Sequence, residues 1–202
     1  MENILNAFSS PIVTTIIEKN TNVLKKETNY ASNDYQAYTE KSNFKVLEKY
    51  PKVKKILLEE YKKFAREKLH YSEEFKISTS WITQIETGGH CQKHCHKNSF
   101  YSGVYYFDEY EKNKGGILEF ESPLKNFSDF YLLPKEWNFL NSTIIEIPPV
   151  KKLLILFPSY LNHRVLPYYG TTVRKSLAFN IVPVGSYGQR DSNYDASWFN
   201  IG

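Results

Sequence analysis

The second half of the sequence consists largely of short runs in which apolar and polar residues alternate, and this pattern constrains the fold more than any other feature. An alternation with period two is typical of β-strands that are buried on one face. Pairs of glycine or proline, which favour turns, follow several of these runs, as at Gly88-Gly89, Gly115-Gly116 and Pro148-Pro149. The predicted strands are residues 77–85, 102–107, 117–121, 144–147, 153–157 and 174–182. Short strands in series predict a β-sandwich or a barrel.

The clearest pattern before these strands is helical. From Val53 to about Leu69 the apolar residues recur every three or four positions, and Pro51 stands where the first turn of a helix tolerates proline. We therefore expect an α+β, mainly β fold, with N-terminal helices packed on the outside of the sheet.

The length of 202 residues suits a single domain with a sizeable core. Its expected parts are a helical and strand support at 1–75, a metal-binding β core at 76–184 and a tail at 185–202, and residues 123–141 are expected to form an insertion over one mouth of the barrel.

Composition narrows the classes of partner. The net charge of +4 is too small to indicate nucleic acid as a partner. No apolar run approaches the roughly 20 residues that span a bilayer, so no membrane is expected. The only two cysteines, Cys91 and Cys95, lie four positions apart and cannot form a disulfide framework, so we expect a cytoplasmic protein.

Histidines cluster between the first two predicted strands. Three of the five histidines, His90, His94 and His96, fall within seven residues. Neutral imidazole is a good ligand for iron, copper and zinc, so this cluster predicts a metal site. A fourth histidine, His163, follows the buried run 153–157 after a proline, and this places it at the end of a strand.

Arginine and serine share one face of the last predicted strand. Period-two alternation puts Arg174, Ser176, Ala178 and Asn180 on the same side. An arginine and a serine that point into a barrel beside a metal form a fork suited to a carboxylate.

In this order, the motifs resemble the iron(II)- and 2-oxoglutarate-dependent oxygenases, and within them a branch of small bacterial and phage oxygenases. The resemblance covers about residues 76–183, and its matching segments are residues 80–82, 94–106, 156–163 and 174–180. It implies a double-stranded β-helix (a jelly roll) that binds Fe(II) and uses 2-oxoglutarate as co-substrate with dioxygen.

The resemblance also implies roles for individual residues. His94 corresponds to the first metal ligand and His163 to the distal one. Arg174 corresponds to the residue that binds the far carboxylate of 2-oxoglutarate, assisted by Ser176, and Tyr106 falls where prolyl-hydroxylase-like members place a tyrosine on that carboxylate. The implied activity is a dioxygenase, specifically a hydroxylase, that couples decarboxylation of 2-oxoglutarate to C–H oxidation of a small-molecule or peptidyl substrate. Related enzymes often pair, so a homodimer is an expectation as well.

The sequence departs from the family at one ligand position. Most members have Asp or Glu two residues after the first histidine, whereas this chain has His96. Three interpretations follow. His96 completes a three-histidine site; the pair is His96 with Asn98, so that His94 lies outside; or a carboxylate comes from Glu119 or Glu121.

Competing functions remain at this point. A cupin-type metal-dependent dioxygenase would use His94, His96 and His163 without 2-oxoglutarate. A non-catalytic jelly-roll binding protein would need neither a metal ion nor 2-oxoglutarate. A structural zinc site built on Cys91 and Cys95 is less favoured, because the chain lacks the second cysteine pair that such sites use.

Overall fold

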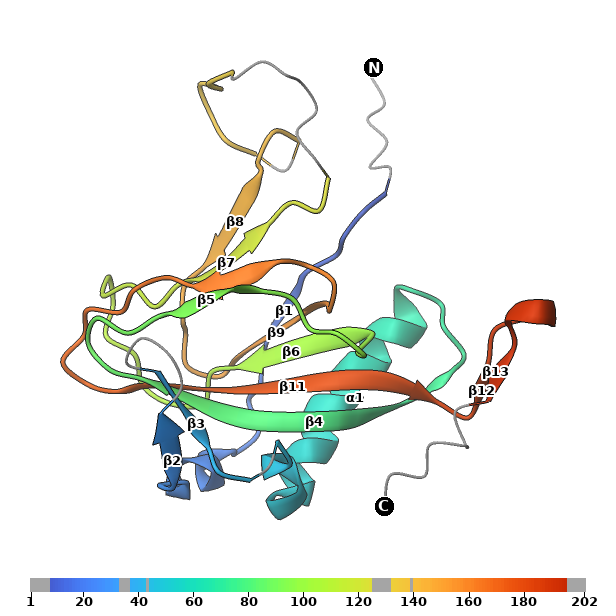
Figure 1. Ribbon diagram of the computed structural model, residues 1–202, viewed down its shortest axis with the longest axis horizontal. Helices are drawn as coiled ribbons and strands as arrows, with labels where there is room; N and C mark the ends of the chain where they lie inside the picture. Colours follow the sequence, from blue (N-terminus) through green and yellow to red (C-terminus); the bar gives the residue numbers. More distant parts are fainter. Residues whose placement is uncertain (1–7, 33–36, 43, 125–131, 139, 196–202) are drawn as a thin grey trace.

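The protein is an arrangement of two antiparallel β-sheets with one long helix, seen in a computed structural model that describes residues 8–32, 37–42, 44–124, 132–138 and 140–195 (Figure 1). The large sheet has seven strands in the order β1-β9-β6-β11-β4-β3-β2, and the small sheet has four in the order β5-β10-β7-β8. The small sheet lies over one face of the large sheet, and the helix lies on the opposite face. This layering is the expected mainly β fold with a helix outside.

The large sheet consists of β1 (Val13–Ile16), β2 (Tyr30–Ser32), β3 (Ala37–Glu40), β4 (Glu74–Ile85), β6 (Tyr101–Tyr105), β9 (Leu153–Pro158) and β11 (Arg174–Val184). The small sheet consists of β5 (Cys91–His94), β7 (Leu118–Glu121), β8 (Ile144–Ile147) and β10 (His163–Val165). A hairpin of β12 (Ser186–Tyr187) and β13 (Tyr194–Asp195) follows, and the helices are α1 (Pro51–Glu67) and the short 3₁₀ turns η1 (Asn22–Lys26), η2 (Val46–Lys49) and η3 (Arg190–Ser192).

The helix α1 packs on the large sheet through its apolar stripe. Leu57 and Tyr61 are fully buried and belong to the same cluster as Leu177 and Phe179 of β11. The helical pattern in the sequence therefore marks a real amphipathic helix, which ends two residues before Leu69.

A second apolar cluster lies between the two sheets and includes Tyr106, Phe120, Ile155 and Phe157. All six residues of β9 are buried, because alternate side chains pack toward α1 and toward the small sheet. The same alternation in β11 sends Leu177, Phe179 and Ile181 to the helix side. Its other face, which begins with Arg174, is therefore turned to the space between the sheets.

All six strands expected from the alternation are present, as β4, β6, β7, β8, β9 and β11. The pattern does not predict β5 and β10, which have only four and three residues. These two short strands carry His94 and His163.

Two expected segments lie partly beyond the described residues. In the insertion at 123–141, residues 125–131 and 139 are outside the described part, and no described residue of the insertion lines the cavity between His163 and Arg174. In the tail, the residues from 196 on, which include Trp198 and Phe199, are also outside it. Within the described part of the chain, no helix has the length and hydropathy needed to cross a membrane.

Candidate metal centre

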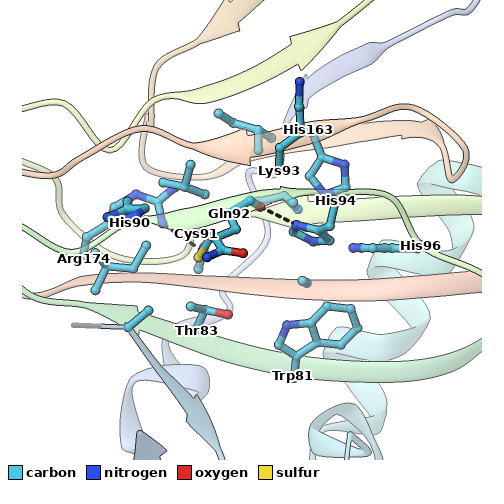
Figure 2. Close-up of a pocket in the computed structure, with 17 residues that line it drawn as sticks. Trp81, Thr83, His90, Cys91, Gln92, Lys93, His94, His96, His163 and Arg174 are labelled. Atoms are coloured by element: carbon cyan, nitrogen blue, oxygen red, sulfur yellow. Dashed lines mark hydrogen bonds between the residues drawn. The ribbon is translucent and has the colours of Figure 1, made fainter. Parts of the chain in front are cut away.

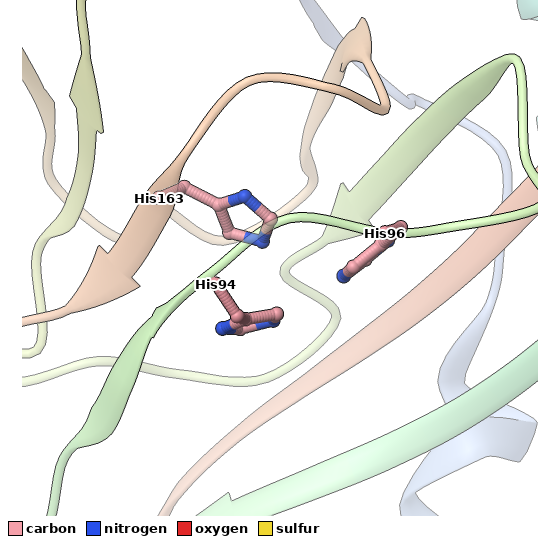
Figure 3. Close-up of side chains that lie close together, drawn as sticks. All are labelled: His94, His96 and His163. Carbon is pink, nitrogen blue, oxygen red and sulfur yellow. The ribbon is translucent and has the colours of Figure 1, made fainter.

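Three histidines converge between the two sheets (Figure 3). His94 ends β5 and stands directly opposite His163, the first residue of β10, while His96 follows in the loop after β5. The ring centroids lie 4.4 Å apart for His94 and His163, 5.0 Å for His96 and His163, and 5.3 Å for His94 and His96. One ring nitrogen from each histidine lies within 4.8 Å of the other two. This spacing suits one shared metal ion.

Backbone carbonyls fix the tautomer of two of these histidines. The Nδ1 atom of His94 is 2.7 Å from the carbonyl oxygen of Gln92, and that of His163 is 2.9 Å from the carbonyl oxygen of Leu161. A carbonyl oxygen can only accept, so each Nδ1 carries the proton. The Nε2 atoms keep their lone pairs for a metal.

The third histidine is held by side chains. His96 Nδ1 is 2.7 Å from Asn180 Oδ1 and 2.8 Å from Ser102 Oγ. Because Asn180 Nδ2 donates to Thr79 Oγ1 at 2.9 Å, the amide oxygen is the atom that faces His96. His96 therefore donates from Nδ1 as well, and its Nε2 is available. Three imidazole nitrogens are a donor set that suits iron.

Burial keeps two of the imidazoles neutral. Desolvation lowers the pKa of His96 to about 4 and that of His163 to about 3. His163 is only 4% exposed. Since a histidine must be unprotonated to bind a metal, these pKa shifts suit a metal site at neutral pH.

The geometry favours one of the three interpretations of His96. Glu119 accepts hydrogen bonds from Arg164 at 2.6 and 3.1 Å, and both residues lie on the face of the small sheet opposite His163. Glu121 pairs with Lys93 at 3.0 Å. Among the described residues, the only group of three or more histidine, cysteine or acidic side chains that lie close enough to share a metal ion consists of His94, His96 and His163. This group contains no carboxylate and no thiol. The arrangement thus fits a three-histidine site and neither a Glu119 or Glu121 ligand nor a cysteine zinc site.

A buried arginine lies in the same interior. Arg174 is 1% exposed, and its Nε donates to the carbonyl oxygen of Gly116 at 3.0 Å. Nη1 donates to Ser176 Oγ at 3.3 Å and Nη2 to Tyr106 Oη at 3.0 Å. No ion pair joins this guanidinium to a carboxylate within the described part of the chain, and its hydrogen-bond partners there are neutral. A buried charge is costly unless it is paired, so this site calls for an anion.

One cavity of about 330 Å³ connects the histidines with the arginine (Figure 2). Its walls include the three histidines, Arg174, Ser176, Trp81, Thr83, Cys91, Val104 and Val165. Tyr106 does not line the cavity but is fully buried against Arg174, with its ring centroid 5.1 Å from the guanidinium carbon. Of the three residues expected to hold 2-oxoglutarate, Arg174 and Ser176 face the cavity and Tyr106 supports the arginine.

The comparison with protein families decides the class of protein. The family described as "Putative 2OG-Fe(II) oxygenase" matches residues 79–180, about half of the chain. The chain belongs to this family. It is an oxidoreductase, a 2-oxoglutarate-dependent dioxygenase whose cofactors are iron(II), 2-oxoglutarate and dioxygen.

Solved structures agree on the fold. The epimerase SnoN from nogalamycin biosynthesis, described as non-heme and alpha-ketoglutarate dependent, superposes with a TM-score of 0.61 at 7% identity, over 89% of this chain and 82% of that one. HygX from Streptomyces hygroscopicus with nickel and 2-oxoglutarate bound gives a TM-score of 0.57 at 8% identity, over 86% and 83%. A prolyl-4-hydroxylase from Pseudomonas putida gives 0.53 at 14% identity, over 85% and 93%. The double-stranded β-helix expected from the resemblance is thus confirmed. A search of curated protein sequences gives no match.

Two local features of this oxygenase shape the arginine end of the cavity. Gly116 has φ +66°, and a Cβ atom there would lie 2.7 Å from Arg174 Cδ, so the turn at Gly116 needs glycine for both reasons. In the ladder of β5 and β10, His163 pairs with His94 but Val165 pairs with Cys91, so β5 contains one extra residue. This bulge lets Cys91 and His94, three residues apart, both line the cavity.

The sequence pattern missed the residues that hold His96. Asn180 was expected on the inner face of its strand, but an amide has no motif that announces a hydrogen bond to a histidine. Ser102 and Ser159 are both fully buried and lie 2.8 Å apart, oxygen to oxygen. The signal that the sequence did offer is Ser102, which the alternation of residues 102–107 puts on the same face as Val104 and Tyr106.

Proposed function

We propose that this oxygenase is a hydroxylase that holds iron(II) with His94, His96 and His163 and binds 2-oxoglutarate through Arg174 and Ser176. Its substrate is a small molecule or a peptidyl side chain. The observation that carries the proposal is one cavity with three imidazole Nε2 atoms at one end and a buried arginine without a described counter-ion at the other.

The residues fit the cofactors by their chemistry. A planar guanidinium binds a carboxylate through two parallel N–H bonds, and Ser176 adds a hydroxyl donor beside it. Tyr106 and the Gly116 carbonyl hold the guanidinium in place, so little side-chain entropy is lost when the carboxylate binds. Three imidazole ligands leave the remaining positions of an iron ion open.

When bound, iron(II) would supply the chemistry by which dioxygen is reduced at the expense of 2-oxoglutarate and of a C–H bond, so that one oxygen atom enters the C–OH group and the other enters succinate, with carbon dioxide as co-product. The protein orients the reactants and limits water. Val104, Leu118 and Val165 give the cavity an apolar wall. Three neighbouring residues that line the cavity, Gln92, Lys93 and His94, are exposed, so the cavity opens to solvent beside β5. The substrate presents its C–H group from that side.

The test is binding under anaerobic conditions. Iron(II) and 2-oxoglutarate together should give the visible charge-transfer band of the chelate, and Arg174→Ala should abolish it or weaken it strongly. Arg66→Ala is the matched control, because Arg66 and its partner Glu74 are both 56% exposed, on the outside of the protein. Iron binding without the band would point to a cupin-type dioxygenase, and binding of neither to a non-catalytic jelly-roll protein.

A second measurement concerns the substrate class. Succinate formation above the substrate-free rate, followed by mass spectrometry, should respond to one of two panels, small metabolites or peptides. An increment of 16 mass units on the responding compound, one oxygen atom, would identify hydroxylation. Desaturation or epimerisation would leave no such increment and would contradict it.

A further inference from the structure

The side chains behind His96 form a partly buried hydrogen-bond network in which every member is neutral. It consists of Thr79, Ser99, Ser102, Ser159 and Asn180, which come from β4, the loop after β5, β6, the end of β9 and β11. The described partners of His94 and His163 are neutral backbone carbonyls. No carboxylate therefore hydrogen-bonds to any of the three imidazoles in the described part of the chain.

The direction of each bond in the network follows from its end point. Ser99 donates to the carbonyl oxygen of Tyr101 at 2.9 Å, and a carbonyl cannot donate back. Ser159 must then donate to Ser99, 2.8 Å away. With its proton used there, Ser159 accepts from Ser102 at 2.8 Å, so the single hydroxyl proton of Ser102 is not available to Asn180 Oδ1, which lies 2.9 Å away. Asn180 Oδ1, fixed by the bond from Nδ2 to Thr79, is left to accept from His96 Nδ1 at 2.7 Å.

The backbone at this point is shaped to deliver the amide. The ladder of β11 and β4 has a bulge between Asn180 and Ile181, because Asn180 pairs with Thr79 while Ile181 pairs with Ile77. Ser78 is the extra residue, and its hydroxyl donates to the Asn180 carbonyl oxygen at 3.4 Å. Bulges beside active sites commonly re-aim side chains.

From this geometry we infer that Asn180 is the positioning residue of the metal site. Its amide oxygen fixes the tautomer of His96 and, because the amide is neutral, it adds no negative charge to that ligand. The inference rests on the proposed three-histidine site. In most of the family a carboxylate binds the metal where His96 stands, so a neutral amide behind a neutral ligand leaves the ion without a negatively charged ligand among the described residues. Asn180 is the position where one isosteric change, Asn180→Asp, places a carboxylate against the ligand.

Two variants separate positioning from a structural role, because they should act in opposite directions. Asn180→Ala removes the acceptor, and loss of such an outer partner typically weakens metal binding by about 10–100-fold. Asn180→Asp keeps the shape and adds a negative charge to form a carboxylate–histidine–metal triad, so metal binding should tighten by about tenfold. A purely structural asparagine would lose affinity in both.

The experiment is titration calorimetry of the full chain with Ni²⁺, supported by ¹⁵N NMR of the metal-free protein to read the His96 tautomer. Asn98→Asp is the matched control, because the Asn98 side chain is exposed, lies two residues from His96 and takes part in none of the hydrogen bonds of the network; the Ni²⁺ affinity of this variant should stay within about twofold of the wild type. In metal-free Asn180→Ala, the Nδ1–H signal of His96 should change to a mixture of tautomers.

Each outcome is decisive. If the wild type binds Ni²⁺ and both Asn180 variants bind it as tightly as the wild type, or both bind it more weakly than the wild type, the proposed role of Asn180 is wrong and the three-histidine site stands. If the wild type does not bind the metal, the proposed site itself is wrong. Thermal unfolding of each variant shows whether a loss of affinity reflects a loss of folding.

Discussion

His163 lies directly opposite His94 across the ladder of β10 and β5, with the two imidazole centroids 4.4 Å apart. Neighbouring strands of an antiparallel sheet hold opposite side chains at a fixed short spacing, so the sheet itself sets this pair of ligands. His96 comes from the adjoining loop and needs the network around Asn180 to reach the same point. Two ligands are therefore positioned by backbone pairing and the third by side chains.

The first prediction concerns the ligand pair. His163→Ala should weaken Ni²⁺ or Fe²⁺ binding by more than about 100-fold, a loss greater than that of an outer hydrogen-bond partner. Calorimetric titration measures it. His70→Ala is the control, because His70 is exposed and does not line the cavity. Unchanged affinity in the His163 variant would show that the ion, if it binds, binds elsewhere.

The sequence predicted the parts of this fold that repeat a pattern over several residues. The alternation of β11 places Arg174 and Ser176 together on the inside, and the structure agrees. The strands β5 and β10 are too short to show a period, and the bulge in β5 breaks the alternation at the point where Cys91 and His94 both turn inward. Register is a property of the paired strands, so the sequence alone left the choice between His96 and Glu119 as ligand open.

The second prediction concerns the turn beneath the arginine. Gly116→Ala should destabilise the protein by about 1–3 kcal/mol, because φ is +66° and the new Cβ meets Arg174 Cδ at 2.7 Å. It should also lower the affinity for 2-oxoglutarate, since the guanidinium must move. Chemical unfolding and the anaerobic charge-transfer titration measure the two effects.

Gly185→Ala is the control for this turn. Gly185 has φ +76° but open space around a Cβ atom, so the variant shares the backbone strain without the contact with Arg174. It should lose stability and keep its affinity for 2-oxoglutarate. Equal loss of affinity in both variants would assign the effect to general destabilisation.

The third prediction concerns acid sensitivity of the metal-free protein. Burial lowers the pKa of His96 to about 4 and of His163 to about 3, whereas an unfolded histidine titrates near 6.5. Between these values the unfolded chain binds more protons, so stability is complete above about pH 6.5 and falls as the pH decreases. From pH 7 to pH 5 the free energy of unfolding should drop by about 2–4 kcal/mol.

Urea unfolding at the two pH values measures this dependence. In His163→Ala the drop should be about half as large, because one of the two depressed groups is gone. A free energy of unfolding that stays constant from pH 7 to pH 5 in the wild type would show that these imidazoles are not held neutral.

The last prediction uses the two cysteines as reporters of the cavity. Cys91 lines the cavity that Arg174 also lines, whereas Cys95, four residues on, does not line it. Burial raises the pKa of the Cys91 thiol, with Arg174 acting in the opposite direction, so alkylation by iodoacetamide at neutral pH should be slow. Because 2-oxoglutarate bound at Arg174 covers this wall, it should slow the alkylation of Cys91 by a further factor of about 10 or more at saturation.

Peptide mass spectrometry gives the alkylation rates of both cysteines in one sample, and Cys95 should react at the same rate with and without 2-oxoglutarate. Protection of both cysteines would indicate a global change, and protection of neither would place 2-oxoglutarate away from Arg174.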